Sequence, residues 1–126
     1  MGAEKTEIRS YKDLLVWKAS LELAVGCYLA TKSFPGAEIY GMTSQIRRAS
    51  ASIAANVAEG HGRENRGAFI QFLRIAQGSL KELETHLILS ERVALLETET
   101  AADLLRKTDE IGRMLRSLIR TLQEKQ

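Results

Sequence analysis

The sequence predicts an all-α protein, an antiparallel up-down-up-down four-helix bundle with left-handed packing. Three observations support this fold class. Apolar residues recur every three or four positions in four long segments, three clear breaks separate these segments, and no stretch shows the alternation typical of a strand. The bundle is predicted to cover residues 11–123 as one domain, with helices at about 11–33, 42–60, 66–92 and 99–123.

The first helix is predicted from a seam that ends at the only proline of the chain. Ser10 is a suitable N-cap, and Pro35 with Gly36 ends the helix, because proline donates no backbone hydrogen bond and restricts the residue before it. Residues 1–10 are expected to form a flexible N-terminal segment, and 124–126 a C-terminal tail. The expected seam consists of Leu14, Trp17, Leu21, Ala24, Tyr28 and Thr31.

The bundle is organised around residues 40–60, because apolar or small side chains occupy two opposite sides of this helix. Thr43 is expected to cap it and Gly60 to end it in a left-handed C′ conformation. One stripe should face the core: Met42, Ile46, Ala49, Ile53 and Val57. The opposite side is rich in alanine, which implies a second close neighbour, either another helix or another subunit. The predicted oligomer or helix-packing face comprises Ala51, Ala54, Ala55, Ala58 and, on the third helix, Gly78.

A polar seam runs between these two sides of the second helix. Unpaired polar groups are costly to bury, at about 1–3 kcal/mol each, so the seam is expected to be hydrogen-bonded and to fix the register of the helices. A ligand or catalytic site made by the same groups is the alternative. The seam consists of Gln45, Ser52, Asn56 and Glu59.

The third and fourth helices each show one clear seam. Gly78 lies inside the third helix, where glycine costs about 1 kcal/mol relative to alanine, so it is expected to permit a close crossing with the small residues of the second helix. Thr98 or Thr100 is expected to cap the fourth helix, the latter in a capping box with Asp103. The two seams are Phe69, Leu73, Ala76, Leu80, Leu83 and Leu87, and Leu104, Thr108, Ile111, Leu115, Leu118 and Leu122.

Two adjoining motifs, YGMTSQIRRA at 40–49 and SIAANVAEG at 52–60, resemble the signature of a known family. This family comprises the four-helix bundle proteins named after the intervening sequences of bacterial 23S ribosomal RNA genes. Further matches lie at 11–14, 34–35, 76–80 and 82–84, so the resemblance covers nearly the whole chain and weakens from about Leu89. The resemblance implies a homo-oligomeric ring. A pentamer is favoured, because relatives such as the accessory proteins of diversity-generating retroelements look like five-fold assemblies.

The bulk charge gives little support for nucleic-acid binding, since 18 Lys and Arg against 16 Asp and Glu leave a net charge of +2. Local clusters are the candidates for contacts with RNA or DNA, and ordinary surface charge is the alternative interpretation. One cluster is expected to face solvent opposite the last seam, and the other lies where the third helix begins. No aromatic residue is interleaved with either, so binding would be mostly electrostatic. The candidate contacts are Arg63, Arg66, Arg113, Arg116 and Arg120.

No nucleophile, base and orienting group converge at an interpretable spacing, so we expect no catalytic residues, cofactor or metal. Glu82 and His86 give a weak alternative, a histidine phosphotransfer-like protein. The single Cys27 is expected to be a core residue, and no apolar run is long enough to span a membrane. The sequence therefore predicts a non-enzymatic, cytoplasmic homo-oligomer that binds RNA or DNA electrostatically. A protein–protein adaptor without nucleic-acid binding is the alternative.

Overall fold

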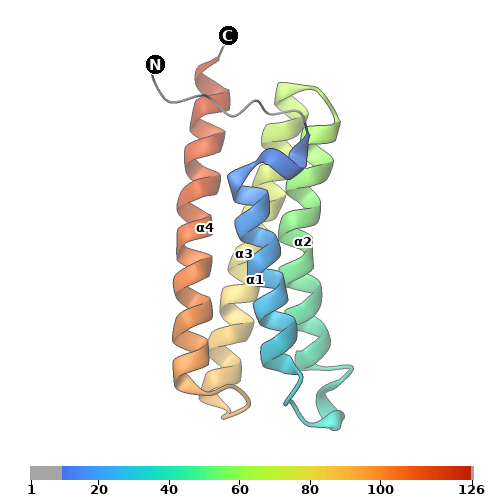
Figure 1. The fold of residues 1–126 in the computed structure, drawn as a ribbon, viewed down its shortest axis with the longest axis vertical. Coiled ribbons are helices and arrows are strands. Elements are labelled where there is room, and N and C mark those ends of the chain that lie inside the picture. Colours follow the sequence, from blue (N-terminus) through green and yellow to red (C-terminus); the bar gives the residue numbers. More distant parts are fainter. Residues whose placement is uncertain (1–9, 126) are drawn as a thin grey trace.

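The computed structural model describes residues 10–125, and its four long α-helices lie side by side along one axis (Figure 1). The helices are α1 (Leu15–Thr31), α2 (Met42–Gly62), α3 (Arg66–Arg92) and α4 (Thr98–Glu124). Two short 3₁₀ helices, η1 (Tyr11–Asp13) and η2 (Gly36–Glu38), precede α1 and α2. The described residues form no strand, and the all-α prediction is confirmed. Apart from Ser10, the predicted N-terminal segment lies outside the described residues, as does the last residue of the predicted tail.

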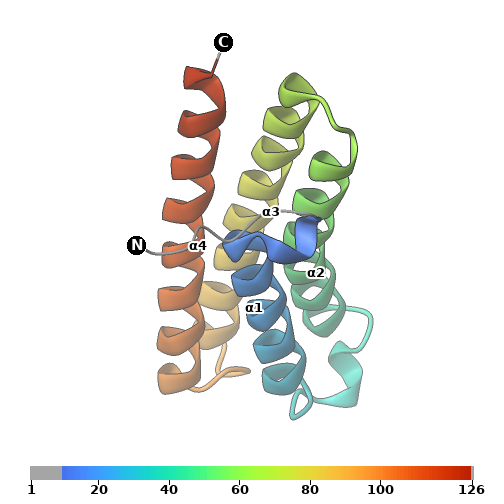
Figure 2. The ribbon, with the colours of Figure 1, turned by 45° about the horizontal axis from the view of Figure 1, so that its top comes forward.

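The helices form a four-cornered bundle. α1 packs against α2 and α4, and α3 packs against the same two helices. α1 and α3 therefore occupy opposite corners, with α2 and α4 on either side of them (Figure 2). Successive helices run in opposite directions along the long axis (Figure 1). The predicted four-helix bundle is confirmed, while its left-handed packing stays a prediction.

The core lies between the four helices and is built largely from the predicted seams of α2, α3 and α4. Ile46, Ile53 and Val57 of α2 are fully buried, and so are Leu73 and Leu83 of α3. Met42, Phe69, Leu118 and Leu122 are partly buried against this core. Apolar spacings of three and four residues therefore predicted correctly which side of α2, α3 and α4 faces the core.

The predicted seam of α1 is wrong in part. Leu21 and Tyr28 are exposed, whereas Val16, Ser20, Leu23 and Cys27 are buried together with Ala24 and Thr31. α1 carries apolar residues on nearly every side, and Lys18 and Glu22 are its only charged residues. α1 therefore has two apolar stripes with helical spacing. Packing against α2 and α4 buries the second stripe, which differs from the predicted seam.

Several predicted helix ends are also corrected. Ser10 caps η1 rather than α1, because its hydroxyl accepts a hydrogen bond from the backbone of Lys12. Thr43 is buried inside α2, and the Glu38 side chain accepts from the Met42 N–H at 3.0 Å in its place. α4 follows Glu97 without a side-chain cap, so neither threonine predicted to cap it does so. α4 also extends through Glu124, into the predicted tail.

The two glycines singled out in the sequence have roles different from those predicted. α2 continues past Gly60 to Gly62, and the left-handed residue of the connection is Glu64, with φ of 54°. Gly60 instead permits close packing on α3, because a Cβ built there would lie 2.6 Å from Cβ of Phe72. Gly78 has no neighbouring atom within 4 Å of such a Cβ, so the predicted close crossing at this residue is wrong.

Candidate functional site

An exposed apolar surface runs along the outer side of α1 and α2, and we call it the α1–α2 face. Leu21, Val25 and Leu29 of α1 are 44%, 54% and 59% exposed, and Ala51 and Ala55 of α2 are exposed beside them. These side chains line a shallow groove of about 580 Å³ between the two helices. Scattered exposed leucines are ordinary, but several in one groove are typical of an interaction surface.

The structure divides the predicted alanine face into an inner and an outer part. Ala54 is buried and Ala58 is half-buried, whereas Ala51 and Ala55 are exposed. Gly78, the remaining residue of the predicted face, lies on α3 and is exposed. Part of the alanine side therefore packs within the chain, and its outer residues are open to a further neighbour. The apolar α1 residues of this surface were not predicted, because Leu21 was assigned to the core.

One edge of the α1–α2 face is fixed by Arg47 of α2. Its Nε donates to Oγ1 of Thr31 at 2.9 Å, and one terminal nitrogen lies 3.4 Å from the carbonyl oxygen of Tyr28. The guanidinium also lies 4.8 Å from the centroid of the Tyr28 ring. These contacts connect α2 to the C-terminal end of α1 and hold the tyrosine ring at the edge of the face.

Two of the four residues of the predicted polar seam form a hydrogen-bonded group. The amide nitrogen of Asn56 donates to the carbonyl and the hydroxyl of Ser52, at 2.8 and 3.0 Å. The Ser52 hydroxyl lies 2.9 Å from that of Ser79 on α3. Gln45 and Glu59 are exposed, and Glu59 pairs with Arg63 instead. The seam therefore connects α2 to α3 through serine hydroxyls, and it is shorter than predicted.

The basic residues at the α2–α3 connection are partly engaged within the chain. Arg63 forms an ion pair with Glu59 at 3.0 Å, and its guanidinium lies 5.0 Å from the centroid of the Phe72 ring. Asn65 caps α3 by accepting a hydrogen bond from the Ala68 N–H at 2.8 Å. These contacts occupy Arg63 and one of the free N–H groups that were candidates for holding a phosphate, while Arg66 remains exposed.

A second groove lies between α3 and α4 and is lined mainly by arginine and glutamine. Its residues are Arg74 and Gln77 of α3 with Arg116, Ile119, Arg120 and Gln123 of α4, around a volume of about 280 Å³. We call it the arginine groove. Arg116 and Arg120 were predicted contacts, whereas Arg74 was missed. Arg113, the third residue of the predicted cluster, does not line the groove and pairs with Asp109.

Charge is distributed unevenly along α3 and α4. Residues 66–78 of α3 and 113–123 of α4 contain no aspartate or glutamate, and both segments lie at the same end of the bundle (Figure 1). In 79–92 and 98–112, acidic residues outnumber basic ones, and Glu124 is the one acidic residue of α4 beyond position 112. We call the two ends of this helix pair the basic end and the acidic end. The basic end carries Arg66, Arg74, Arg113, Arg116 and Arg120.

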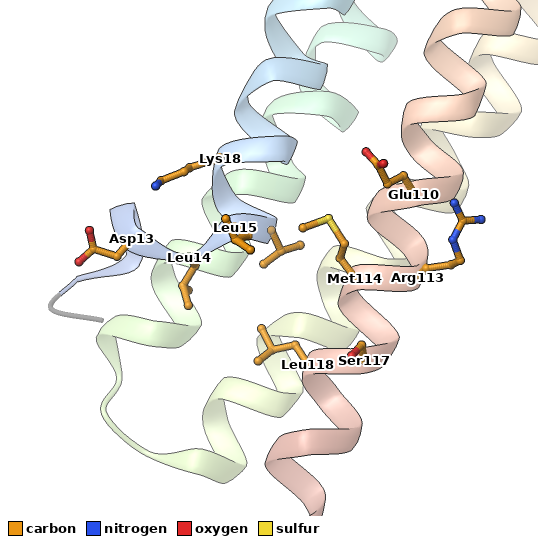
Figure 3. A pocket seen from close by; sticks show the side chains of 10 residues that line it. Asp13, Leu14, Leu15, Lys18, Glu110, Arg113, Met114, Ser117 and Leu118 are labelled. Carbon is orange, nitrogen blue, oxygen red and sulfur yellow. The ribbon is translucent and has the colours of Figure 1, made fainter. Parts of the chain in front are cut away.

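A further pocket, of about 750 Å³, lies where α1 begins beside α4 (Figure 3). Leu14, Leu15, Met114 and Leu118 form much of its lining, and Ser117 supplies a hydroxyl. Charged residues complete the lining: Asp13, Lys18, Glu110 and Arg113. The pocket is an apolar hollow beside charged groups.

Residues 10–125 form no cluster suited to a metal ion, and the surroundings of His86 do not favour its phosphorylation. No three or more His, Cys, Asp or Glu side chains in this range gather as they would to hold a metal ion. His86 lies 3.3 Å from a carboxylate oxygen of Glu82, and a carboxylate at this distance would oppose the charge of a phosphohistidine. None of the described helices has the length and apolarity that a membrane crossing requires.

The single cysteine is a core residue, as predicted. Cys27 is fully buried. Desolvation raises the pKa of its thiol to about 12, although the Ser50 side chain and, more weakly, Lys107 act in the opposite direction. A thiol with so high a pKa is a poor nucleophile near neutral pH, because little thiolate is present.

The fold and these surfaces define the class of protein. The chain is a small all-helical four-helix bundle with an exposed apolar groove on one side and an arginine-lined groove on another.

The comparisons with known proteins then identify the family. The model of the 23S rRNA-intervening sequence protein family matches residues 12–117, and the chain belongs to this family. The fold is also similar to a crystal structure from Bacteroides thetaiotaomicron VPI-5482, described as a protein with unknown function from the S23 ribosomal protein family. That match has a TM-score of 0.75 and 30% identity, and it covers 83% of this chain and 98% of the other. No curated protein matches the chain.

Proposed function

We propose that this chain is a non-enzymatic, cytoplasmic protein that assembles with copies of itself, as a pentamer, through the α1–α2 face. The observation that carries the proposal is the groove in which Leu21, Val25 and Leu29 are exposed beside Ala51 and Ala55. Alanine side chains let a second helix approach closely, while the larger apolar residues supply area that association removes from water. A second copy is the occupant to which we commit.

The proposed role of the assembly is to bind RNA or DNA by charge. Each copy carries a net charge of only +2, but the basic end of α3 and α4 carries five arginines, and its segments 66–78 and 113–123 contain no acidic residue. Repeating this end around a ring makes binding multivalent, and avidity can raise affinity by about 10²–10⁴ when the geometry allows simultaneous contacts. The family name refers to where some members are encoded, and it does not itself show that this chain binds ribosomal RNA.

Sedimentation velocity at micromolar concentration tests self-assembly. Wild type is expected to sediment as an oligomer, and Ala55→Arg as a monomer with nearly unchanged helicity, because an arginine would place a charge in the buried interface. Ala102→Arg is the matched control, since Ala102 is an exposed helical alanine on α4. A monomeric wild type would refute the assembly, and an oligomeric Ala55→Arg variant would refute the role of this face.

Purification from the native host tests the second part of the proposal. Nucleic acid that elutes with the oligomer, and is released as salt is raised, supports electrostatic binding. Another protein that elutes in its place, with no nucleic acid bound at low salt, would support the adaptor function instead.

A further inference from the structure

We infer that the arginine groove is the site that holds the phosphodiester backbone of the nucleic acid. This inference rests on the proposed nucleic-acid binding and assigns it to particular residues. Arg74 of α3 and Arg116 and Arg120 of α4 line one groove, although they lie more than 40 positions apart in the sequence. Gln77 and Gln123 provide further hydrogen-bond donors.

The three arginines of the groove lack partners and lie together. Across residues 10–125, five Lys and Arg residues form ion pairs: Arg63 with Glu59, Lys81 with Glu84, Arg106 and Lys107 with Asp103, and Arg113 with Asp109. Other cations in this range, such as Arg48, Arg66 and Arg92, also form none, so the distinctive feature is that three unpaired guanidinium groups line one groove. In the same range, Arg74, Arg116 and Arg120 form no ion pair and no hydrogen bond through their side chains. Three guanidinium groups beside one groove repel one another, and an anion between them would remove this repulsion.

The charge around the groove is mainly positive. Neither 66–78 of α3 nor 113–123 of α4 contains an acidic residue. Glu124 ends α4 one turn beyond Arg120, but the two form no ion pair in the described part of the chain. Arg66 adds a further exposed cation on the same segment of α3. The groove is therefore part of a cationic strip along the two helices, whereas an isolated arginine pair would suit a single small anion.

The spacing and chemistry of the groove residues indicate the kind of ligand. Arg116 and Arg120 are one helical turn apart, which is about 6 Å along α4, so the two side chains can contact different anionic groups of one chain. Guanidinium groups bind phosphate oxygens through paired N–H donors. Ile119 is the only apolar residue in the groove, and no aromatic side chain lines it for base stacking. The groove suits a polyanion recognised through its phosphates, with little dependence on base sequence.

The test compares two variants that lose the same charge from the same two helices. Arg74→Gln/Arg116→Gln/Arg120→Gln removes the groove cations, whereas Arg92→Gln/Arg106→Gln/Lys107→Gln removes three cations from the acidic end. Fluorescence anisotropy measures binding of labelled single-stranded RNA and DNA of equal length and sequence over a range of salt concentrations. Circular dichroism and sedimentation check that each variant is folded and assembled as wild type is.

The groove variant is expected to bind about 100-fold more weakly than wild type at 0.1 M salt, because each phosphate contact contributes about 0.7 to the salt slope for single strands and three are removed. Its slope should fall by about 2, while the control variant should stay within about threefold of wild type. Equal losses in both variants, or no loss in the groove variant, would refute this assignment while leaving nucleic-acid binding intact. Failure of wild type to bind RNA or DNA at low salt would instead refute the proposed binding itself and the groove with it.

Discussion

Alanine substitutions at Gly60 and Gly78 should change stability in opposite directions, although both glycines lie inside helices. In an open helix, Gly→Ala stabilises by about 1 kcal/mol, because the glycine backbone loses more conformational freedom on folding. At Gly78 nothing within 4 Å opposes the new methyl group, so the full gain is expected. At Gly60 the methyl would lie 2.6 Å from Cβ of Phe72 and 3.1 Å from a ring carbon of Phe69, well inside the 3.5–4.0 Å at which carbon atoms attract.

The sign at Gly60 depends on whether the neighbours can move. Cβ of Phe72 is attached to the α3 backbone, so no change of rotamer relieves the contact, and α2 must separate from α3. Overpacking costs typically about 1–3 kcal/mol. An overpacking cost at the upper value, about 3 kcal/mol, is offset by a gain in helix propensity of about 1 kcal/mol. Gly60→Ala should therefore lower the free energy of unfolding by about 2 kcal/mol.

Urea unfolding followed by far-UV circular dichroism, at one fixed protein concentration, measures both variants. Gly62→Ala is the control for Gly60→Ala, because Gly62 lies in the last turn of the same helix with nothing within 4 Å of its built Cβ. A Gly60→Ala protein as stable as wild type would refute the packing argument. If Gly78→Ala lowered the free energy of unfolding, a neighbour would have to cover this residue in solution. In the single chain the space around Gly78 is open.

Two further predictions concern buried polar groups. Among the described residues, the buried Ser20 hydroxyl has no hydrogen-bond partner, so Ser20→Ala should raise the free energy of unfolding by about 1 kcal/mol. Ser50→Ala is the control, because it loses a hydrogen bond to the Arg47 carbonyl. It should show no such gain in the same urea titration. Burial raises the pKa of Cys27 from 9.0 to about 12, so the unfolded chain loses this proton first and stability should fall as pH rises from about 9 towards 12. Urea midpoints across this pH range should show a decrease of about 1.4 kcal/mol per pH unit from this group, and Cys27→Ala should lack it.

The sequence predicted the helices best where charge marked the outer side. Seven charged residues of α3 and ten of α4 lie outside the apolar seams, so one assignment of the core fitted. In α1, only Lys18 and Glu22 mark the outside, and the choice between two seams depended on tertiary packing. The predicted roles of the two glycines were wrong for a similar reason. Spacing shows that Gly60 and Gly78 lie near helices, but it does not show which of the two faces a neighbouring helix.

The surfaces were predictable in part. Arg116 and Arg120 are four residues apart on one helix, and periodicity alone places them together outside the seam. Arg74 joins them only through the packing of α3 against α4, which a single sequence does not reveal. Ala51 and Ala55 were predicted from the second apolar side of α2, whereas Leu21, Val25 and Leu29 became visible only when the core of α1 was known.

The uneven charge of α3 and α4 has a consequence for any closed ring of this chain. Copies related by rotation about one axis share a single orientation relative to that axis, so their basic ends occupy equivalent positions around it. Positive potential then accumulates at one rim or along one circumference, and the subunits repel one another there. Mobile ions weaken that repulsion, and a bound polyanion would convert it into attraction between neighbours.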